Sequence, residues 1–196
     1  MHAPLNRVNL VYMARSAGKE HTALGIDPGT ATMGWGVIKW GSPGNKLAYV
    51  QHGAIKTPSD WEMSRRLGTL FDGVTDLIRG YRPEVVSIEQ LFFNTNVTTA
   101  MTVGQARGVA MLAAYKEGVE VAEYTPLQIK QAITSYGRAD KRQMQEMVRT
   151  LLNLREIPKP DDAADGLAAA ICHAFSAKMG GVKSSGGGLN RIGVGK

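Results

Sequence analysis

The sequence predicts a single α/β domain, built on a mixed five-stranded sheet with helices on both faces. Three strand-like segments joined by short turns come first, which is the pattern of an antiparallel meander. Strands and helices then alternate, and such alternation is typical of parallel strands joined by crossover helices. The chain has 196 residues without an internal repeat or an interior linker, so one core accounts for it.

The three opening strands are predicted from apolar runs and the turn residues between them. The first apolar run ends at Asp27, and the Pro28-Gly29 pair after it favours a tight turn. A second apolar run begins at Met33 and forms the return strand. After a turn at residues 41–45, Leu47–Ile55 alternates as the third strand.

Helices are predicted where apolar residues recur at helical spacing. Ser59 or Asp60 is expected to cap a helix that carries apolar residues from Met63 to Ile78 and ends at Arg82-Pro83. The elements expected after it are a strand at 85–88, a helix at 98–116 stopped by Gly118, a strand at 119–124, helices at 127–134 and 140–154, and a helix at 163–178 capped by Asp161 or Asp162.

Both ends of the chain are expected to lie outside the folded domain, which we place at residues 23–178. Residues 1–22 are mixed and basic and read as a flexible leader, within which Met13 is an alternative start. Residues 179–196 are rich in Gly and Ser with scattered Lys and Arg, and their low apolar content predicts a disordered basic tail.

Composition narrows the possible partners and the location. The formal net charge is +6 with a pI near 9.5, which favours a polyanion such as nucleic acid. Cys172 is the only cysteine, so an intrachain disulfide and a Cys-rich zinc site are excluded and a cytoplasmic location is expected. No run is long and apolar enough to predict a membrane span.

Four acidic residues occupy positions where a carboxylate is costly. Asp27 and Glu89 each end an apolar strand, and Asp162 and Asp165 share one face at the start of an apolar helix. Neighbouring strand ends in an α/β sheet bring their terminal residues together. Carboxylates gathered in this way repel one another unless divalent cations bind between them, and oxygen ligands select Mg²⁺ or Mn²⁺ over zinc.

This acidic set is suited to phosphodiester hydrolysis. Two divalent ions about 4 Å apart activate a water molecule and stabilise the leaving oxygen. Asp27 would bridge both ions, Glu89 would hold one, and Asp165 with Asp162 would hold the other. Asp27, Asp162 and Asp165 also have a plainer explanation, since Asp-Pro-Gly forms turns and acids at a helix start favour the helix dipole. Glu89 has less of one, because a Glu at the end of a buried strand has no capping use.

Four motifs resemble those of the bacterial RuvC family of Holliday junction resolvases, in the family's order and spacing, within Ala23–Phe175. They are Gly25-Ile26-Asp27-Pro28-Gly29, Ile88-Glu89-Gln90-Leu91-Phe92, Gly104–Ala110 and Asp162–Ala168. The resemblance implies a ribonuclease H-like fold and a homodimer that nicks two opposed strands of a four-way junction, using Mg²⁺ or Mn²⁺, and it implies work with RuvA and RuvB. The family's acidic positions fall on Asp27, Glu89, Asp162 and Asp165, of which the third is His in some members.

The resemblance also singles out residues that would contact DNA. Phe92 matches the family's aromatic near the crossover, where it would stack on an unpaired base. Lys130 and Lys141 match basic positions near the catalytic centre and would neutralise phosphates, although a solvated surface lysine is the plainer alternative. Arg138 and Arg142 are expected as further phosphate contacts.

The helix at 98–116 leaves two questions open. Arg107 lies among small residues, and its position fits DNA contact and packing equally. Small and apolar residues recur along this helix (Ala100, Val103, Ala106, Val109, Ala110 and Ala113) and would allow a second helix to approach, but a core helix has the same pattern. A dimer contact there follows mainly from the resemblance.

We expect a structure-selective endodeoxyribonuclease that resolves Holliday junctions by paired, symmetric nicks in DNA recombination and repair. One alternative is a module that binds branched DNA without cutting it. Another is an actin-like ATPase or sugar kinase, whose phosphate loop resembles the turn after Gly25; such chains are about two domains long. His52, His173 and Cys172 are assigned no chemistry.

Overall fold

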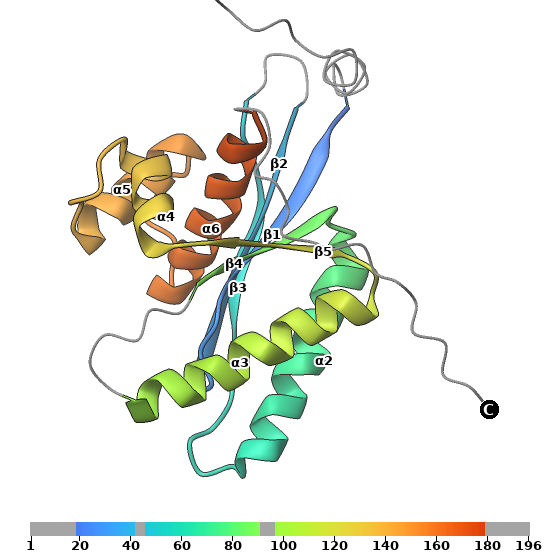
Figure 1. Cartoon of the computed structure of the whole chain (residues 1–196). Helices are drawn as coiled ribbons and strands as arrows, with labels where there is room; N and C mark the ends of the chain where they lie inside the picture. The colour runs from blue at the N-terminus through green and yellow to red at the C-terminus, as the bar shows by residue number, and fades with distance from the viewer. Residues whose placement is uncertain (1–18, 42–45, 91–96, 179–196) are drawn as a thin grey trace, which may run out of the picture.

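The structure is a computed structural model that describes residues 19–41, 46–90 and 97–178. Within them five strands form one sheet in the order β3-β2-β1-β4-β5 (Figure 1). Their bounds are β1 (His21–Asp27), β2 (Thr32–Trp40), β3 (Ala48–Lys56), β4 (Val85–Glu89) and β5 (Glu120–Tyr124). β1, β2 and β3 pair antiparallel, whereas β4 runs parallel to β1 and β5 runs parallel to β4. The predicted mixed five-stranded sheet is confirmed.

Helices cover both faces of the sheet, as predicted (Figure 1). α2 (Met63–Tyr81) and α3 (Val97–Lys116) pack on one face. α4 (Pro126–Thr134), α5 (Lys141–Leu151) and α6 (Asp161–Lys178) lie on the other face, and α6 packs directly on β1 and β2. Each face therefore has its own buried apolar core.

Alternation along the central strands decides which face carries the acids. Leu24 and Ile26 of β1 belong to the core under α2 and α3, whereas Ala23 belongs to the core under α6. In β4, Ser87 donates a 2.7 Å hydrogen bond from its hydroxyl to the backbone oxygen of Ala169 in α6. Because side chains alternate with period two, the last residues of β1 and β4 face α6 as well.

Glycines let α6 approach the sheet at backbone distance. A Cβ on Gly34 of β2 would lie 2.7 Å from the Cβ of Asp162, and one on Gly25 of β1 would lie 2.6 Å from the Ala170 nitrogen. On the helix side, a Cβ on Gly166 would lie 2.7 Å from the Cα of Trp35. Any larger residue at these positions would push the helix away from the sheet.

The start of α2 and the end of α5 differ from the predictions. Glu62, rather than Ser59 or Asp60, precedes α2 as its N-cap, without a side-chain capping bond. The reason is a turn before the helix, in which the Trp61 nitrogen donates to the Pro58 oxygen at 3.3 Å. Ser59 and Asp60 lie inside this turn and therefore do not cap the helix. α5 ends at Leu151 instead of residue 154, because Asn153 adopts a left-handed φ of 51°.

The remaining differences concern the ends of the domain. α6 begins at Asp161, so Asp161 and Asp162 lie inside its first turn and are not its cap. β1 begins at His21, two residues before the predicted start of the domain. Residues 1–18, residues 179–196 and Phe92 lie outside the described part of the chain. No helix in the described part is long and apolar enough to cross a membrane.

Candidate active site

Asp27 and Glu89 are the last residues of two neighbouring parallel strands. β1 and β4 pair with Ile26 opposite Ile88, so the two acids that follow come next in the same register. Both side chains leave the sheet toward α6 and are partly buried. The topology therefore joins the first two predicted site residues at one edge of the sheet, as expected for strand ends of an α/β sheet.

The start of α6 brings Asp162 and Asp165 to the same edge. Asp162 lies against Gly34, and Gly34 is the cross-strand partner of Asp27. Asp165 follows one helical turn later on the same side of the helix. The close glycine contact thus determines where these two carboxylates lie.

The carboxylates raise one another's pKa. Burial is the largest cause for Asp27, followed by the charges of Asp165, Glu89 and Asp162, and together they raise its pKa to about 7. Burial also raises the pKa of Glu89, and Asp165 adds to that rise. The pKa of Asp165 is raised as well, first by burial and then by Asp162 and Asp161 against the lowering effect of Lys141. Repulsion of this kind costs stability unless positive charge meets it.

Two lysines supply part of that positive charge. Lys141, the first residue of α5, places its Nζ 3.5 Å from the Asp165 Oδ2 and 3.7 Å from the Asp161 Oδ2, and it lowers the pKa of Asp27. Lys130 of α4 is half-buried and lowers the pKa of Glu89. Both lysines predicted to act near the catalytic centre therefore lie at the carboxylates.

The two predicted arginines lie further out. Arg138 in the α4–α5 turn and Arg142 in the first turn of α5 are exposed. Neither forms an ion pair with another residue of the described chain. Their guanidinium groups are therefore available to an anionic ligand.

The chemistry of the four carboxylates suits a hard divalent cation. They offer only oxygen donors and are partly buried, and burial together with neighbouring negative charges raises the pKa of Asp27, Glu89 and Asp165. Within the described residues, no three His, Cys, Asp or Glu side chains form a group already arranged around one point for a metal ion. The four carboxylates therefore supply the type of donor atom that a hard divalent cation prefers, and their negative charges act on one another.

Two residues of this region show roles that the sequence left open or missed. Arg107 of α3 forms an ion pair with Glu123 of β5, and its Nε lies buried, so packing rather than DNA contact accounts for it. Asp161, expected only as a cap, pairs with Lys159 at 3.1 Å as well as with Lys141. In the sequence Asp161 stands out only as the neighbour of Asp162, and that position does not predict its ion pairs with the two lysines.

His173 lies away from the carboxylates, near the far end of α6. Its Nδ1 shares a 2.9 Å hydrogen bond with the Tyr124 hydroxyl, and burial lowers its pKa to about 4. A neutral, buried histidine of this kind is compatible with the prediction that it takes no part in the chemistry.

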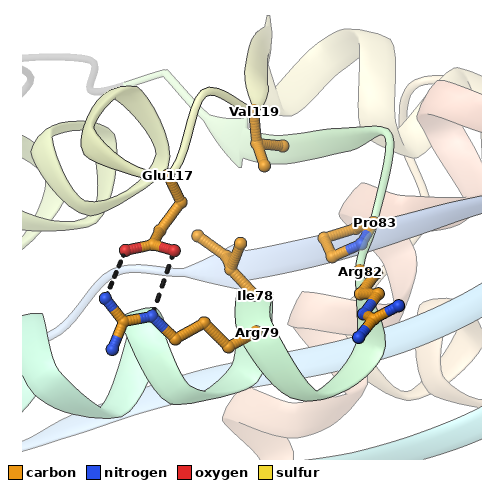
Figure 2. A pocket seen from close by; sticks show the side chains of 6 residues that line it. All are labelled: Ile78, Arg79, Arg82, Pro83, Glu117 and Val119. Carbon is orange, nitrogen blue, oxygen red and sulfur yellow. Dashed lines mark hydrogen bonds and ion pairs between the residues drawn. The ribbon is translucent and has the colours of Figure 1, made fainter.

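A surface hollow exists at the opposite edge of the sheet (Figure 2). It lies where α2 and α3 end, next to the beginnings of β4 and β5, whereas the acids lie at the end of β4. Arg79 donates two hydrogen bonds to Glu117 there, at 3.1 and 2.8 Å. The charges of Arg79 and Glu117 neutralise each other. The hollow is not part of the acidic site.

The mixed sheet and the helices on both of its faces define the class of fold, which is ribonuclease H-like. Residues 23–173 match the family described as crossover junction endodeoxyribonuclease RuvC. The chain therefore belongs to the RuvC family. It is therefore an endodeoxyribonuclease, which is a hydrolase.

Relatives and solved structures agree with this assignment. The crossover junction endodeoxyribonuclease RuvC of Rubrobacter xylanophilus is 77% identical over 156 residues, which cover 80% of this chain and 86% of the relative. The structure of Thermus thermophilus RuvC in complex with Holliday junction substrate matches with a TM-score of 0.74 at 35% identity, over 81% of this chain and 96% of that one. A yeast mitochondrial Holliday junction resolvase shares the fold alone, with a TM-score of 0.61 at 13% identity over 89% of this chain and 88% of that one.

Family membership decides between the functions that the sequence left open. Because the family is one of endonucleases, we drop two hypotheses: the module that binds branched DNA without cutting it, and the ATPase or sugar kinase. Membership of this nuclease family also implies a general dependence on divalent metal ions.

Proposed function

We propose that the enzyme resolves Holliday junctions by paired symmetric nicks, and that Asp27, Glu89, Asp162 and Asp165 form its catalytic centre. The observation that carries this proposal is the meeting of acids from β1, β4 and α6 at one end of the sheet, where burial and three neighbouring carboxylates raise the pKa of Asp27 to about 7. An acid that only forms a turn or caps a helix does not require other carboxylates beside it. The cluster loses its repulsion only when cations join it.

Mg²⁺ is the proposed cofactor, with two ions in each site, and Mn²⁺ is expected to support activity as well. Such ions supply an activated water and stabilise the leaving oxygen during phosphodiester hydrolysis. Asp27 feels the charges of Glu89 on β4 and of both α6 acids, which suits a carboxylate shared by two ions. Glu89 would hold one ion, and Asp165 with Asp162 would hold the other, once the side chains turn toward them.

Basic side chains around the carboxylates would hold the DNA. Lys130 and Lys141 would neutralise phosphates next to the cut, and their charges acting on Glu89 and Asp165 support this role. Arg138 and Arg142 would contact the backbone further away. Phe92 is proposed to stack on a base near the crossover, as its match to the family's aromatic implies.

A homodimer would deliver the two nicks, and α3 offers a surface for it. Ala106, Ala110 and Ala113, which the sequence suggested for helix contact, are fully buried in the chain's own core. The opposite face of α3 exposes Met101, Leu112 and Tyr115, which are 64%, 48% and 64% exposed. Their spacing of 11 and 3 residues puts them on one side of the helix, as an interface with a second copy requires.

Two further parts of the proposal rest on family membership alone. RuvA and RuvB are the proposed partners that bring the enzyme to a junction. The cytoplasm is the proposed location, because the DNA substrate lies there.

The substitution Asp27→Asn tests the assignment of the site. It removes the shared negative charge and preserves the shape, so cleavage of a synthetic four-way junction with Mg²⁺ should fall at least about a hundredfold. Junction affinity should change little, because binding depends on the basic surface. Both are measured on one labelled junction, by denaturing gel for cleavage and by mobility shift for binding.

Asp72→Asn is the matched control, since Asp72 is an exposed acid on α2, away from the cluster. This variant should cleave at the wild-type rate. Normal cleavage by Asp27→Asn would show that the catalytic centre lies elsewhere.

A further inference from the structure

An exposed apolar patch, formed by Leu127 and Tyr136, lies at α4 and the turn between α4 and α5. Leu127 and Tyr136 are 54% and 50% exposed, and in the described chain only residues of α3 share such exposure of a large hydrophobic side chain. The Leu127 side chain packs on Gly137, the residue next to Tyr136. The two side chains therefore form one patch, and neither the proposed metal chemistry nor the α3 surface uses it.

Tyr136 is held in place although its ring is half exposed. Its backbone oxygen accepts a 2.6 Å hydrogen bond from the Thr134 hydroxyl, and its own hydroxyl donates to the Gln143 Oε1 at 3.3 Å. Gln143 also closes the capping box of α5 with Asp140. The ring is thus fixed over the start of the helix that carries Lys141, and a preorganised contact residue loses little entropy on binding.

The surroundings of the patch are strongly basic. Residues 126–143 contain four cations, namely Lys130, Arg138, Lys141 and Arg142, and one acid, Asp140. The Asp140 carboxylate is occupied by the Gln143 nitrogen at 2.8 Å. An aromatic ring among cations is the combination that binds unpaired nucleic acid, because bases stack on the ring while phosphates meet the charges.

The patch also lies at the edge of the catalytic centre. Lys130 follows Leu127 by three residues on the same side of α4, and its charge acts on Glu89. Lys141, two residues before the Gln143 that accepts from Tyr136, has its Nζ 3.5 Å from the Asp165 Oδ2. A base next to a phosphate held by these lysines would come within reach of the Tyr136 ring.

We propose that Tyr136, supported by Leu127, stacks on a nucleobase that is unpaired or unstacked at the junction crossover. Tyr136 is then a positioning residue, which holds the distorted strand so that its phosphate stays at the carboxylates. The inference rests on the proposed function, because the carboxylates mark where the strand is cut.

The test uses full-length protein and four-way junctions that carry 2-aminopurine in turn at each crossover position, in EDTA so that no strand is cut. The wild type and Tyr136→Phe should both quench the probe at one position because both have the aromatic ring, whereas quenching at a position that persists in Tyr136→Ala belongs to another ring such as Phe92. Tyr136→Ala should lose that quenching and bind the junction about fivefold more weakly or worse. Its affinity for a linear duplex should stay unchanged, because a duplex offers no unpaired base.

Three results would overturn the proposal. One is a wild-type protein that quenches the probe at no crossover position, a result that needs no variant to fold. Another is an equal loss of affinity for junction and duplex in Tyr136→Ala, which would indicate a general contact. The third is wild-type quenching by Tyr136→Leu, which would show that the ring does not contact the base.

Asp27→Asn, measured for quenching in EDTA and for cutting of the same junctions with Mg²⁺, separates this inference from the proposed function. Loss of cutting with the quenching retained supports both. Normal cutting by Asp27→Asn with the quenching retained would refute the catalytic assignment and leave the stacking contact established.

Discussion

Asp27 is a single residue whose charge depends on its surroundings. It ends a buried strand, and the charges of Glu89, Asp162 and Asp165 add to the effect of burial, so its pKa rises to about 7 from an ordinary value of 3.8. Near neutral pH the metal-free protein therefore holds a proton there for part of the time. Because metal ions bind the ionised form, metal affinity should increase as the pH rises through this range.

The same shift predicts how stability depends on pH. A carboxyl whose pKa is raised in the folded state binds more protons folded than unfolded, so its stabilising effect is present near pH 4 and is lost as the pH rises through about 7. Asp27→Asn has no such proton to lose. In the metal-free protein at pH 8 it should be more stable than the wild type, by roughly 1–4 kcal/mol, and the gap should close toward pH 4.

Thermal unfolding in EDTA, followed by circular dichroism at several pH values, measures this difference. Asp72→Asn serves as the control and should track the wild type at every pH, because that carboxylate is exposed. A wild type that is more stable than Asp27→Asn at pH 8 without metal would contradict the predicted repulsion.

α6 is the element that completes the site, and it does so through a contact without side chains. Gly25 and Gly34 on the sheet meet the helix at backbone distance, with Gly166 opposite them. These positions show why the sequence needs glycine in the middle of two strands, where it is otherwise unfavourable. The contact sets how far the acids of α6 lie from the strand that carries Asp27.

Gly34→Ala should therefore damage both fold and activity. The new methyl group would lie 2.7 Å from the Asp162 Cβ, so α6 must shift, which should cost about 1–3 kcal/mol of stability. Cleavage should fall as well, because Asp162 moves with the helix. Urea unfolding and the junction cleavage assay measure the two effects.

The matched control is Gly68→Ala in α2, where an added Cβ meets nothing within 4 Å. This change should stabilise the protein, by about 0.5–1 kcal/mol, since alanine favours a helix over glycine. If Gly34→Ala were as stable and as active as the wild type, the close contact would not position Asp162.

For the whole molecule, the central question is how one chain cuts two strands. The exposed face of α3 with Met101, Leu112 and Tyr115 is the surface proposed to join two copies. This face and the carboxylates lie on opposite sides of the sheet, because α3 packs on one face and α6 on the other. A dimer through α3 thus leaves both acidic sites uncovered.

Leu112→Glu should break that dimer. A charge at the centre of an apolar interface is costly to bury, so the solution mass should fall to that of one chain. The variant should nick single strands but lose the paired, symmetric cuts. Analytical ultracentrifugation and a gel of each labelled junction strand provide the measurements.

Leu127→Glu is the control for the mass measurement, since Leu127 is equally apolar and exposed but lies on α4. It should keep the wild-type mass. A Leu112→Glu variant that also kept the wild-type mass would place the partner contact on another surface.

The sequence by itself determined the class of sheet, the two helical layers and the four acidic positions. Period-two alternation and turn residues predict β1, β2 and β3, and motif order connects Asp27 to Glu89 and Asp165 far along the chain. These are properties of local spacing, which a sequence displays directly. Element ends such as Glu62 before α2 were missed, because a competing turn rather than a side-chain cap decided them.

Only the tertiary structure decided what depends on contact between distant segments. It paired Arg107 with Glu123, placed Lys141 between Asp161 and Asp165, and buried the small face of α3 in the chain's own core. The pKa of Asp27 also belongs here, since burial and neighbouring charges from three other segments set it. Such interactions weaken as the distance between the residues increases. For residues far apart in the sequence, only the fold sets that distance.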